Sequence, residues 1–225
     1  MFSIFKKKKI VPHVRLTGII GSGGRFKQGM ELANQRDILK KAFSVKKITH
    51  VAISINSPGG SPVQSHLIYS YIRQLAEKNK VKVIVFAEDV AASGGYYISC
   101  GADWIFAEPN TVTGSIGVLL QTADVTELLK RLGIKSEAIK SGSLKAQPNP
   151  LETTTPEARQ AIKRVVMDMH SMFVDMVVER RKIPIDDARV LGDGRVYTGR
   201  QALANGLIDG IGSEIEALDW LTNKA

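Results

Sequence analysis

Apolar runs that suit buried β-strands alternate along the chain with segments in which apolar residues recur at helical spacing. The strand-like runs are 11–20, 48–56, 81–89, 103–109 and 135–140. The helical segments are 30–43, 63–78, 123–133 and 155–182. This alternation predicts an α/β fold with a largely parallel sheet and flanking helices.

The segment 155–182 is the longest predicted helix, with Thr155 suited to cap it and Pro156 at its first position. Its Met and Val positions are too apolar for a lone surface helix, so we expect its own domain or a neighbouring subunit to cover it. The preceding segment, 141–154, is rich in small residues and prolines, which predicts a surface loop over a site. Beyond residue 182 the pattern predicts short helices and turns.

Three glycine-rich junctions follow predicted strands: NSPGGS at 56–61, ASGG at 92–95 and TGSIG at 113–117. Because the carboxyl ends of parallel strands lie on one edge of a sheet, we expect these junctions to converge. Glycines let backbone N–H groups approach a ligand closely, and such groups stabilise negative charge. Neither GxxxxGK[ST] nor GxGxxG follows a strand, so the pattern predicts a site but disfavours nucleotide binding.

Ser93 stands directly after a strand-like run and before Gly94 and Gly95. One interpretation is a small-residue turn that lets a helix pack tightly against the sheet. The other is a nucleophile whose hydroxyl lies beside unpaired backbone N–H groups, the donors of an oxyanion hole. These residues alone leave both interpretations open.

A serine nucleophile needs a base, and the histidines are poorly placed to provide one. All four lie outside the glycine-rich turns and the loops around them: His13, His50, His66 and His170. His66 falls inside an amphipathic helical segment, which favours a surface or half-buried helix residue. A Ser-His-Asp triad is therefore poorly supported.

Lysine also pairs with serine in some hydrolases, and Lys145 lies alone in the loop 141–154. A lysine acts as a base only as the neutral amine, so its site must disfavour the charge, for example by burial. A neighbouring hydroxyl such as that of Ser115 would suit a neutral amine. The alternative is a solvated loop lysine, the usual environment of this residue type.

The composition fits an ordinary soluble globular protein of 225 residues and 24.6 kDa, with 44% apolar and 24% charged residues. It predicts a basic tail at 1–10 and one domain at 11–225, including a C-terminal helical extension. The net charge is +9, but Lys and Arg are scattered apart from the run 6–9, which disfavours nucleic-acid binding. Cys100 is the only cysteine, which excludes an intrachain disulfide and predicts a small buried apolar residue.

No run approaches the roughly 18 apolar residues that span a bilayer. The start, MFSIFKKKK, has its apolar residues before its basic cluster, the reverse of a secretory signal. We therefore expect a cytoplasmic protein. Phe2, Ile4 and Phe5 beside four lysines suit a weak peripheral contact with an anionic membrane, but a solvated tail is the favoured interpretation.

Four segments, in this order, resemble the signal peptide peptidase A family of serine peptidases: INSPGGSPVQS, AEDVAASGGYYISCGADWIFAEPNTVTGSIGVLL, LGIKSEAIKSGSLKAQPNP and DGRVYTGRQALANGLID. The resemblance runs over about 11–209, and its serine segment with TGSIGV is highly specific. It implies a Clp-protease/crotonase-like fold and a serine endopeptidase with a Ser-Lys dyad. Signal peptides or other short peptides would be the substrates.

At the matching positions, the resemblance implies that Ser93 is the nucleophile, Lys145 the general base and Ser115 the hydrogen-bond partner of the lysine amine. It assigns the oxyanion hole to backbone N–H groups of glycines, Gly94 with Gly59 or Gly60. No cofactor and no metal are expected. The tyrosines that follow, Tyr96 and Tyr97, are expected to pack rather than react.

Family members usually carry an N-terminal membrane anchor, whereas this sequence starts almost directly at its first predicted strand. A cytoplasmic peptidase is therefore favoured over action on signal peptides in the membrane. One alternative is a non-catalytic binding or scaffold relative, against which the intact Ser93, Lys145 and Ser115 argue. The other is a crotonase-like enzyme acting on acyl-CoA, which gives no reason for a Ser-Gly-Gly turn with a loop lysine.

Short relatives form rings, and the resemblance suggests dyads built from the serine of one subunit and the lysine of the next. An interface would also supply burial for Lys145. We therefore expect a homo-oligomer with shared active sites, acting on peptides and not on nucleic acid.

Overall fold

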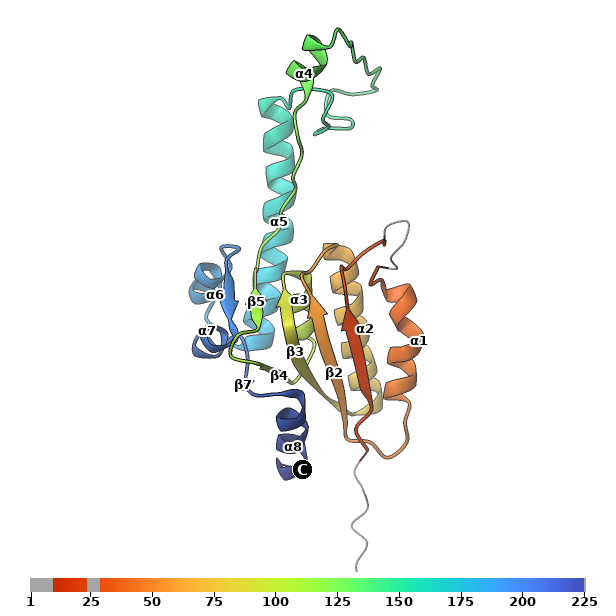
Figure 1. The fold of residues 1–225 in the computed structure, drawn as a ribbon, viewed down its shortest axis with the longest axis vertical. Helices are drawn as coiled ribbons and strands as arrows, with labels where there is room; N and C mark the ends of the chain where they lie inside the picture. The colour runs from red at the N-terminus through yellow and green to blue at the C-terminus, as the bar shows by residue number, and fades with distance from the viewer. Residues whose placement is uncertain (1–9, 24–28, 225) are drawn as a thin grey trace, which may run out of the picture. The chain divides into compact units, whose positions relative to one another are not determined.

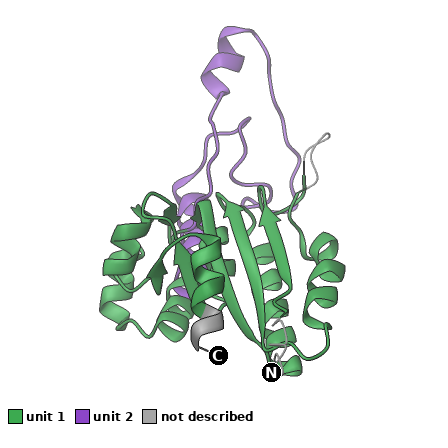
Figure 2. Cartoon of the chain, turned by 60° about the horizontal axis from the view of Figure 1, so that its bottom comes forward, with its two compact units in different colours: residues 1–117, 173–225 green, residues 118–172 purple. Residues whose placement is uncertain are grey.

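The computed structural model describes residues 10–23 and 29–224. They fall into two compact units, one formed by 1–117 with 173–225 and the other by 118–172 (Figure 2). The single peptidase domain over 11–225 stays a prediction. Both interpretations of the basic tail, solvated or in weak contact with a membrane, concern residues within 1–9, outside the described residues.

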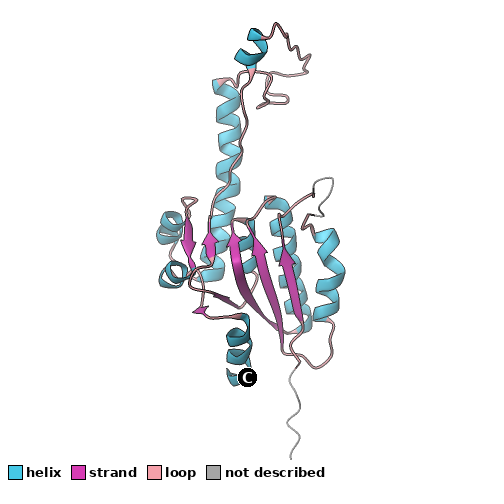
Figure 3. Cartoon of the chain, in the orientation of Figure 1, coloured by secondary structure: helices cyan, strands magenta, loops and turns pink. Residues whose placement is uncertain are grey.

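The first unit is built on a largely parallel sheet (Figures 1 and 3). Its strands are β1 (His13–Thr17), β2 (His50–Ser57), β3 (Lys82–Ala92), β4 (Trp104–Ala107), β5 (Val112–Gly114), β6 (Val196–Thr198) and β7 (Gly210–Ile211). They are ordered β1-β2-β3-β4-β7, while β5 pairs with the end of β3. Only the pairing of β5 with β6 is antiparallel among these strands. The predicted α/β fold with a largely parallel sheet is confirmed.

Helices cover both faces of this sheet because side chains alternate between the faces along each strand. The helices are α1 (Leu32–Phe43), α2 (Pro62–Asn79), α3 (Gly94–Ser99), α6 (Ile185–Leu191), α7 (Gly199–Ala204) and α8 (Glu214–Lys224). Ile53 and Ile55 of β2 belong to the main core, together with residues of α1, α2 and α3. Ala52 points to the other face, where it packs with Ile84 and with Ala217 of α8.

The longest helix, α5 (Pro156–Arg181), belongs to both units. Thr155 Oγ1 accepts a hydrogen bond from Ala158 N at 3.1 Å, which confirms the predicted cap. The part that belongs to the first unit is buried in its core through Phe173 and Val177, which confirms the expected cover for that part. Cover by a neighbouring subunit stays a prediction for the remainder.

One predicted strand is wrong. The second unit contains α4 (Thr126–Arg131), the first part of α5 and connecting loops, and residues 135–140 are in neither helix nor strand. A strand is stable only when a neighbour accepts its backbone hydrogen bonds, and no strand is described in this unit. Ile139, the apolar residue on which that prediction relied, is 98% exposed.

The segment after residue 182 contains the expected short helices, and also the short strands β6 and β7, which the sequence pattern did not predict. Strands of two or three residues carry too little periodicity to be recognised. In the described part of the chain, no helix has both the length and the apolar character needed to cross a membrane.

Candidate active site

The three glycine-rich junctions meet at one place in the first unit. Ser93 N donates to Gly114 O at 2.8 Å, which joins the second junction to the third. A Cβ placed on Gly59 would lie 2.7 Å from Ser93 Cβ, so the first junction is packed directly against the second. The predicted convergence is confirmed.

Ser93 is held in a backbone conformation that residues other than glycine rarely adopt. It stands between β3 and α3 with φ of 53° and ψ of −120°. Such a conformation costs on the order of 1–3 kcal/mol and persists only where the surroundings enforce it. Here the Ser93 N–H bonds to Gly114, and its carbonyl accepts from Tyr97 N at 2.9 Å. The side chain is half-buried, and Oγ makes no hydrogen bond within the described residues of this unit.

Two glycines leave no room for a side chain beside Ser93. Gly59 has φ of 103°, and an added Cβ would also lie 2.8 Å from Gly94 N. An added Cβ on Gly94 would lie 2.3 Å from the Oγ of Ser65, a buried residue of α2. The backbone of the first junction therefore approaches Ser93 more closely than any other residue type would allow.

The backbone donors near Ser93 differ in their partners. Gly59 N donates to Ser57 Oγ at 3.2 Å. Gly60 N and Gly94 N have no acceptor among the described residues of the first unit. Unpaired N–H groups at such a turn can stabilise a developing oxyanion. The N–H groups of Gly60 and Gly94 are therefore better suited to that role than the N–H group of Gly59.

Ser115 lies within the third junction, in the same unit. Ala92 and Gly114 are register partners in the pairing of β3 with β5, so Ser93 and Ser115 directly follow two paired residues. Ser115 also has a positive φ, 51°, and its N–H bonds to Arg195 O at 2.8 Å. The sheet therefore brings Ser93 and Ser115 to neighbouring positions.

Lys145 lies in the second unit, in a turn where its N–H donates to Gly142 O at 3.0 Å. The loop 141–154 has neither helix nor strand, as expected. Near its end, the Glu152 carboxylate pairs with Lys140 and accepts from Gln147 Nε2 at 2.6 Å. The hydrogen bond from Lys140 lowers the pKa of Glu152, which keeps that carboxylate charged. The pairing of Lys145 with Ser93 stays a prediction.

The tyrosines after Ser93 pack, as predicted. Tyr96 is fully buried and donates to Leu207 O at 2.8 Å, and burial raises its pKa well above the usual value. Tyr97 contacts the rings of Tyr69 and Phe173, and burial raises its pKa to about 12. Both hydroxyls therefore stay protonated at neutral pH and are unsuited to act as bases.

Two other predictions from the sequence are confirmed. His66 is an exposed residue of α2 whose Nδ1 lies 3.0 Å from Tyr97 Oη. Cys100 is buried, and burial raises the pKa of its thiol to about 11.

Sequence reasoning missed the buried polar residues that support the junctions. Ser57 and Ser65 are almost fully buried, and Ser65 Oγ donates to Ser61 O at 2.8 Å. Thr113, also buried, donates through Oγ1 to Ala91 O at 2.7 Å. Their signal is a polar residue at an inward position of an apolar element. Among the described residues, no group of three or more His, Cys, Asp or Glu side chains is arranged to hold a metal ion.

Known proteins resemble this chain in sequence. A family model described as peptidase family S49 matches residues 75–225. A Na(+)/H(+) antiporter NhaA of Brucella melitensis biotype 1 is 44% identical over 92% of this chain and 28% of its own length. A putative signal peptide peptidase SppA of Enterococcus faecium is 36% identical over 96% of this chain and 64% of its own. The chain thus spans less than two thirds of either relative.

A solved structure resembles it in fold. It is a mutant of the 1510-N membrane-bound stomatin-specific protease, with a TM-score of 0.57 and 19% identity. The match covers 94% of this chain and 83% of that one, and it supports the expected Clp-protease/crotonase-like fold.

Proposed function

The chain belongs to peptidase family S49, and from this we propose that it is a serine endopeptidase with Ser93 and Lys145 as its catalytic dyad. The observation that carries the proposal is the turn at Ser93. A half-buried serine in a strained conformation, with the backbone of Gly59 packed against it, has the geometry of a nucleophile at a strand-to-helix junction.

The reaction would begin when Ser93 Oγ attacks the carbonyl carbon of a peptide bond while the neutral Lys145 amine accepts the hydroxyl proton. The tetrahedral intermediate then expels the peptide amine, which takes the proton from Lys145. A water molecule attacks the acyl-enzyme ester in the second half, again giving its proton to the Lys145 amine. Ser93 recovers that proton as the ester bond breaks.

The negative oxygen of the intermediate would be stabilised by the N–H groups of Gly94 and of Gly59 or Gly60. Of the last two, Gly60 is favoured because its N–H has no acceptor in the described part of the first unit. Ser115 would accept a hydrogen bond from the lysine amine and orient its lone pair. The neighbouring positions of Ser93 and Ser115 support this role.

The substrates we propose are short peptides. A relative from Enterococcus faecium is named a putative signal peptide peptidase, which supports signal peptides among them. The test is labelling with a fluorophosphonate followed by peptide mapping, together with hydrolysis of a mixed peptide library. Modification at Ser93 with peptide cleavage is expected. Absence of both would contradict the proposal, and turnover of an acyl-CoA would favour the crotonase-like alternative.

Gly59→Ala is expected to reduce peptide hydrolysis by roughly 100-fold or more, because the added methyl would displace Ser93 by an ångström or so. The positive φ of Gly59 adds backbone strain of about 1 kcal/mol. Gly18→Ala is the matched control, since Gly18 also has a positive φ, 105°, but open space where its Cβ would stand. Measuring the hydrolysis rate and the thermal unfolding of both variants separates the effect of backbone strain from the effect of displacing Ser93. Equal losses of activity in the two variants would show that the close packing of Gly59 against Ser93 is not the cause.

We also propose that active sites are shared between subunits of a homo-oligomer. Several apolar side chains of the second unit are exposed, including Leu119 at 81%, Leu132 at 63% and Val165 at 54%. Burying such residues against a second copy would stabilise an assembly. A lysine loop in that unit would then be available to a neighbouring chain.

Mixing inactive Ser93→Ala with inactive Lys145→Ala protein, after dissociation and reassembly, is expected to recover part of the activity. Some interfaces would then pair an intact serine with an intact lysine. Light scattering verifies reassembly, and each variant reassembled alone is the control. Mixed oligomers that remain inactive would show that serine and lysine belong to the same chain.

A further inference from the structure

The pairing of β2 with β3 is interrupted shortly before the two strands end. Ile55 pairs with Ala87, but the next pair is Ser57 with Ala91. One residue of β2, Asn56, therefore stands opposite three residues of β3, 88–90. A bulge of this kind redirects the strand beyond it and leaves backbone groups without their ladder partners.

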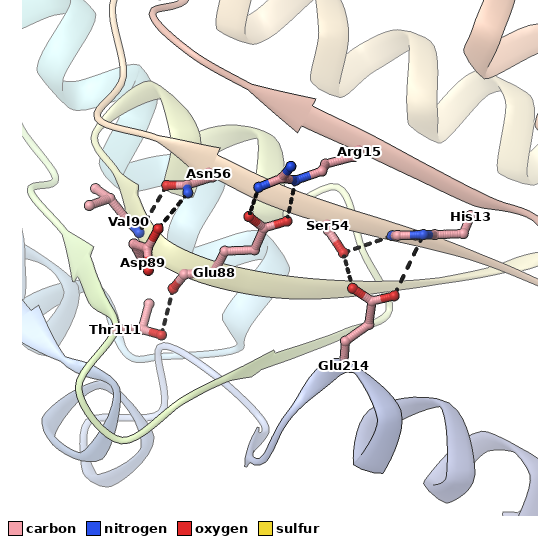
Figure 4. Close-up of polar contacts among 9 residues, drawn as sticks. All are labelled: His13, Arg15, Ser54, Asn56, Glu88, Asp89, Val90, Thr111 and Glu214. Carbon is pink, nitrogen blue, oxygen red and sulfur yellow. Dashed lines mark hydrogen bonds and ion pairs between the residues drawn. The ribbon is translucent and has the colours of Figure 1, made fainter.

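The Asn56 side chain bonds to two residues of the bulge, one through a backbone N–H and one through a side chain (Figure 4). Its Oδ1 accepts a hydrogen bond from Val90 N at 3.3 Å, and its Nδ2 donates to Asp89 Oδ2 at 2.8 Å. Only this orientation of the amide satisfies both contacts, because the reverse would set a donor against a donor and an acceptor against an acceptor. The Asn56 carbonyl also accepts from Gly18 N at 2.9 Å, which ties the same residue to the chain after β1.

Glu88, the first residue of the bulge, is held by β1 and by the segment that precedes β5. Its carboxylate accepts two hydrogen bonds from Arg15 of β1, at 2.7 and 2.6 Å. Its carbonyl accepts from Oγ1 of the buried Thr111 at 2.7 Å. All three bulge residues, 88–90, thus have specific polar partners, and Asn56 supplies those of two of them.

The bulge is separated by the same number of residues from Gly59 after one strand and from Ser93 after the other, the two residues that are packed together in the candidate site. Gly59 follows Asn56 by three residues, and Ser93 follows Val90 by three. An added Cβ on Gly59 would lie 2.7 Å from Ser93 Cβ, so a slip of one strand against the other would move the two groups apart or into collision. The register at the bulge therefore sets the distance between the Gly59–Gly60 backbone and the serine.

We propose that Asn56 is a positioning residue for the peptidase reaction, because its amide fixes the register that holds the oxyanion donors against Ser93. This inference rests on the proposed function. Asn56 stabilises the transition state through the placement of Gly59, Gly60 and Ser93. Its loss is therefore expected to lower kcat while leaving KM nearly unchanged.

Asn56→Asp tests the contacts of Asn56 with Asp89 and Val90, because it sets a second carboxylate against Asp89 while preserving the shape of the side chain. We expect kcat, and the rate of acylation by a fluorophosphonate, to fall about 10- to 100-fold, the range for a displacement of up to about 1 Å. Adding Asp89→Asn restores a pair of one amide and one carboxylate, with the amide donor now at position 89 of β3 and the carboxylate at position 56 of β2. The double variant is therefore expected to recover most of the rate. Ser54→Ala is the matched control: it removes the hydrogen bonds of Ser54 Oγ with Glu214 and His13 from the same strand without touching the bulge, and should leave kcat unchanged.

Hydrogen exchange at the Val90 amide reports on its contact with Asn56 independently of an activity measurement. Faster exchange in Asn56→Asp, reversed in the double variant together with kcat, is the expected result. Faster exchange with unchanged acylation, a loss that the double variant fails to restore, or an equal loss in Ser54→Ala would each overturn the inference. A wild-type protein that neither labels nor cleaves would instead refute the proposed function, and with it the role of Asn56 in that reaction.

Discussion

Ser93→Ala is expected to abolish peptide hydrolysis and fluorophosphonate labelling while the fold stays intact. Removing Oγ removes the only atom that can form the acyl-enzyme, and the loss of a serine nucleophile typically lowers kcat by roughly 10⁴-fold or more. The backbone at this position is held by hydrogen bonds from Ser93 N to Gly114 and from Tyr97 N to the Ser93 carbonyl, neither of which needs the side chain. Residual turnover above the water background would come from the oxyanion donors alone.

Circular dichroism and thermal unfolding establish that the variant is folded, and labelling is followed by mass spectrometry. Ser70→Ala is a suitable control because this serine lies on α2 and contacts His66, away from the junctions. Its activity should match that of the wild type. A Ser93→Ala protein with near wild-type activity would remove Ser93 from the mechanism.

The course of the sheet and the meeting of its junctions were predictable because both depend on patterns that local sequence carries. Long apolar runs such as β2 and β3 are recognisable strands, and parallel strands end on one edge of their sheet. The strand predicted at 135–140 was wrong because a run of six residues forms a strand only if a partner strand is available. Periodicity contains no information about that partner.

The detailed geometry of the candidate site was not predictable, because it depends on contacts between segments that are distant in sequence. The preference for Gly60 over Gly59 as a donor arises from Ser57 Oγ, which accepts from Gly59 N. The role of Asn56 depends on a bulge in β3, and bulges leave no mark in a hydrophobic pattern. The residues alone made Ser93, Lys145 and Ser115 candidates with alternatives left open, and only the resemblance gave them definite roles. The dyad itself stays a prediction.

Lys145→Arg is expected to be inactive although it keeps the positive charge. A general base must accept a proton, and arginine stays protonated in proteins because its pKa lies far above the neutral range. Loss of general-base catalysis typically costs about 10² to 10⁴ in rate. Raising the pH over the accessible range should not rescue the variant, since the guanidinium does not lose its proton there.

A neighbouring lysine, Lys140, offers a control because the same Lys-to-Arg substitution can be made at a residue that forms an ion pair. Lys140 pairs with Glu152, and an arginine can maintain that ion pair. Lys140→Arg is therefore expected to retain activity and stability, while Lys145→Arg loses activity and keeps its unfolding temperature. His66→Ala, which removes the histidine in contact with Tyr97, should also remain active if lysine is the base. A fully active Lys145→Arg protein would contradict the role of Lys145 as base, because that variant has no neutral amine at position 145. An inactive His66→Ala protein that is still folded would also contradict it, because that variant keeps the Lys145 amine.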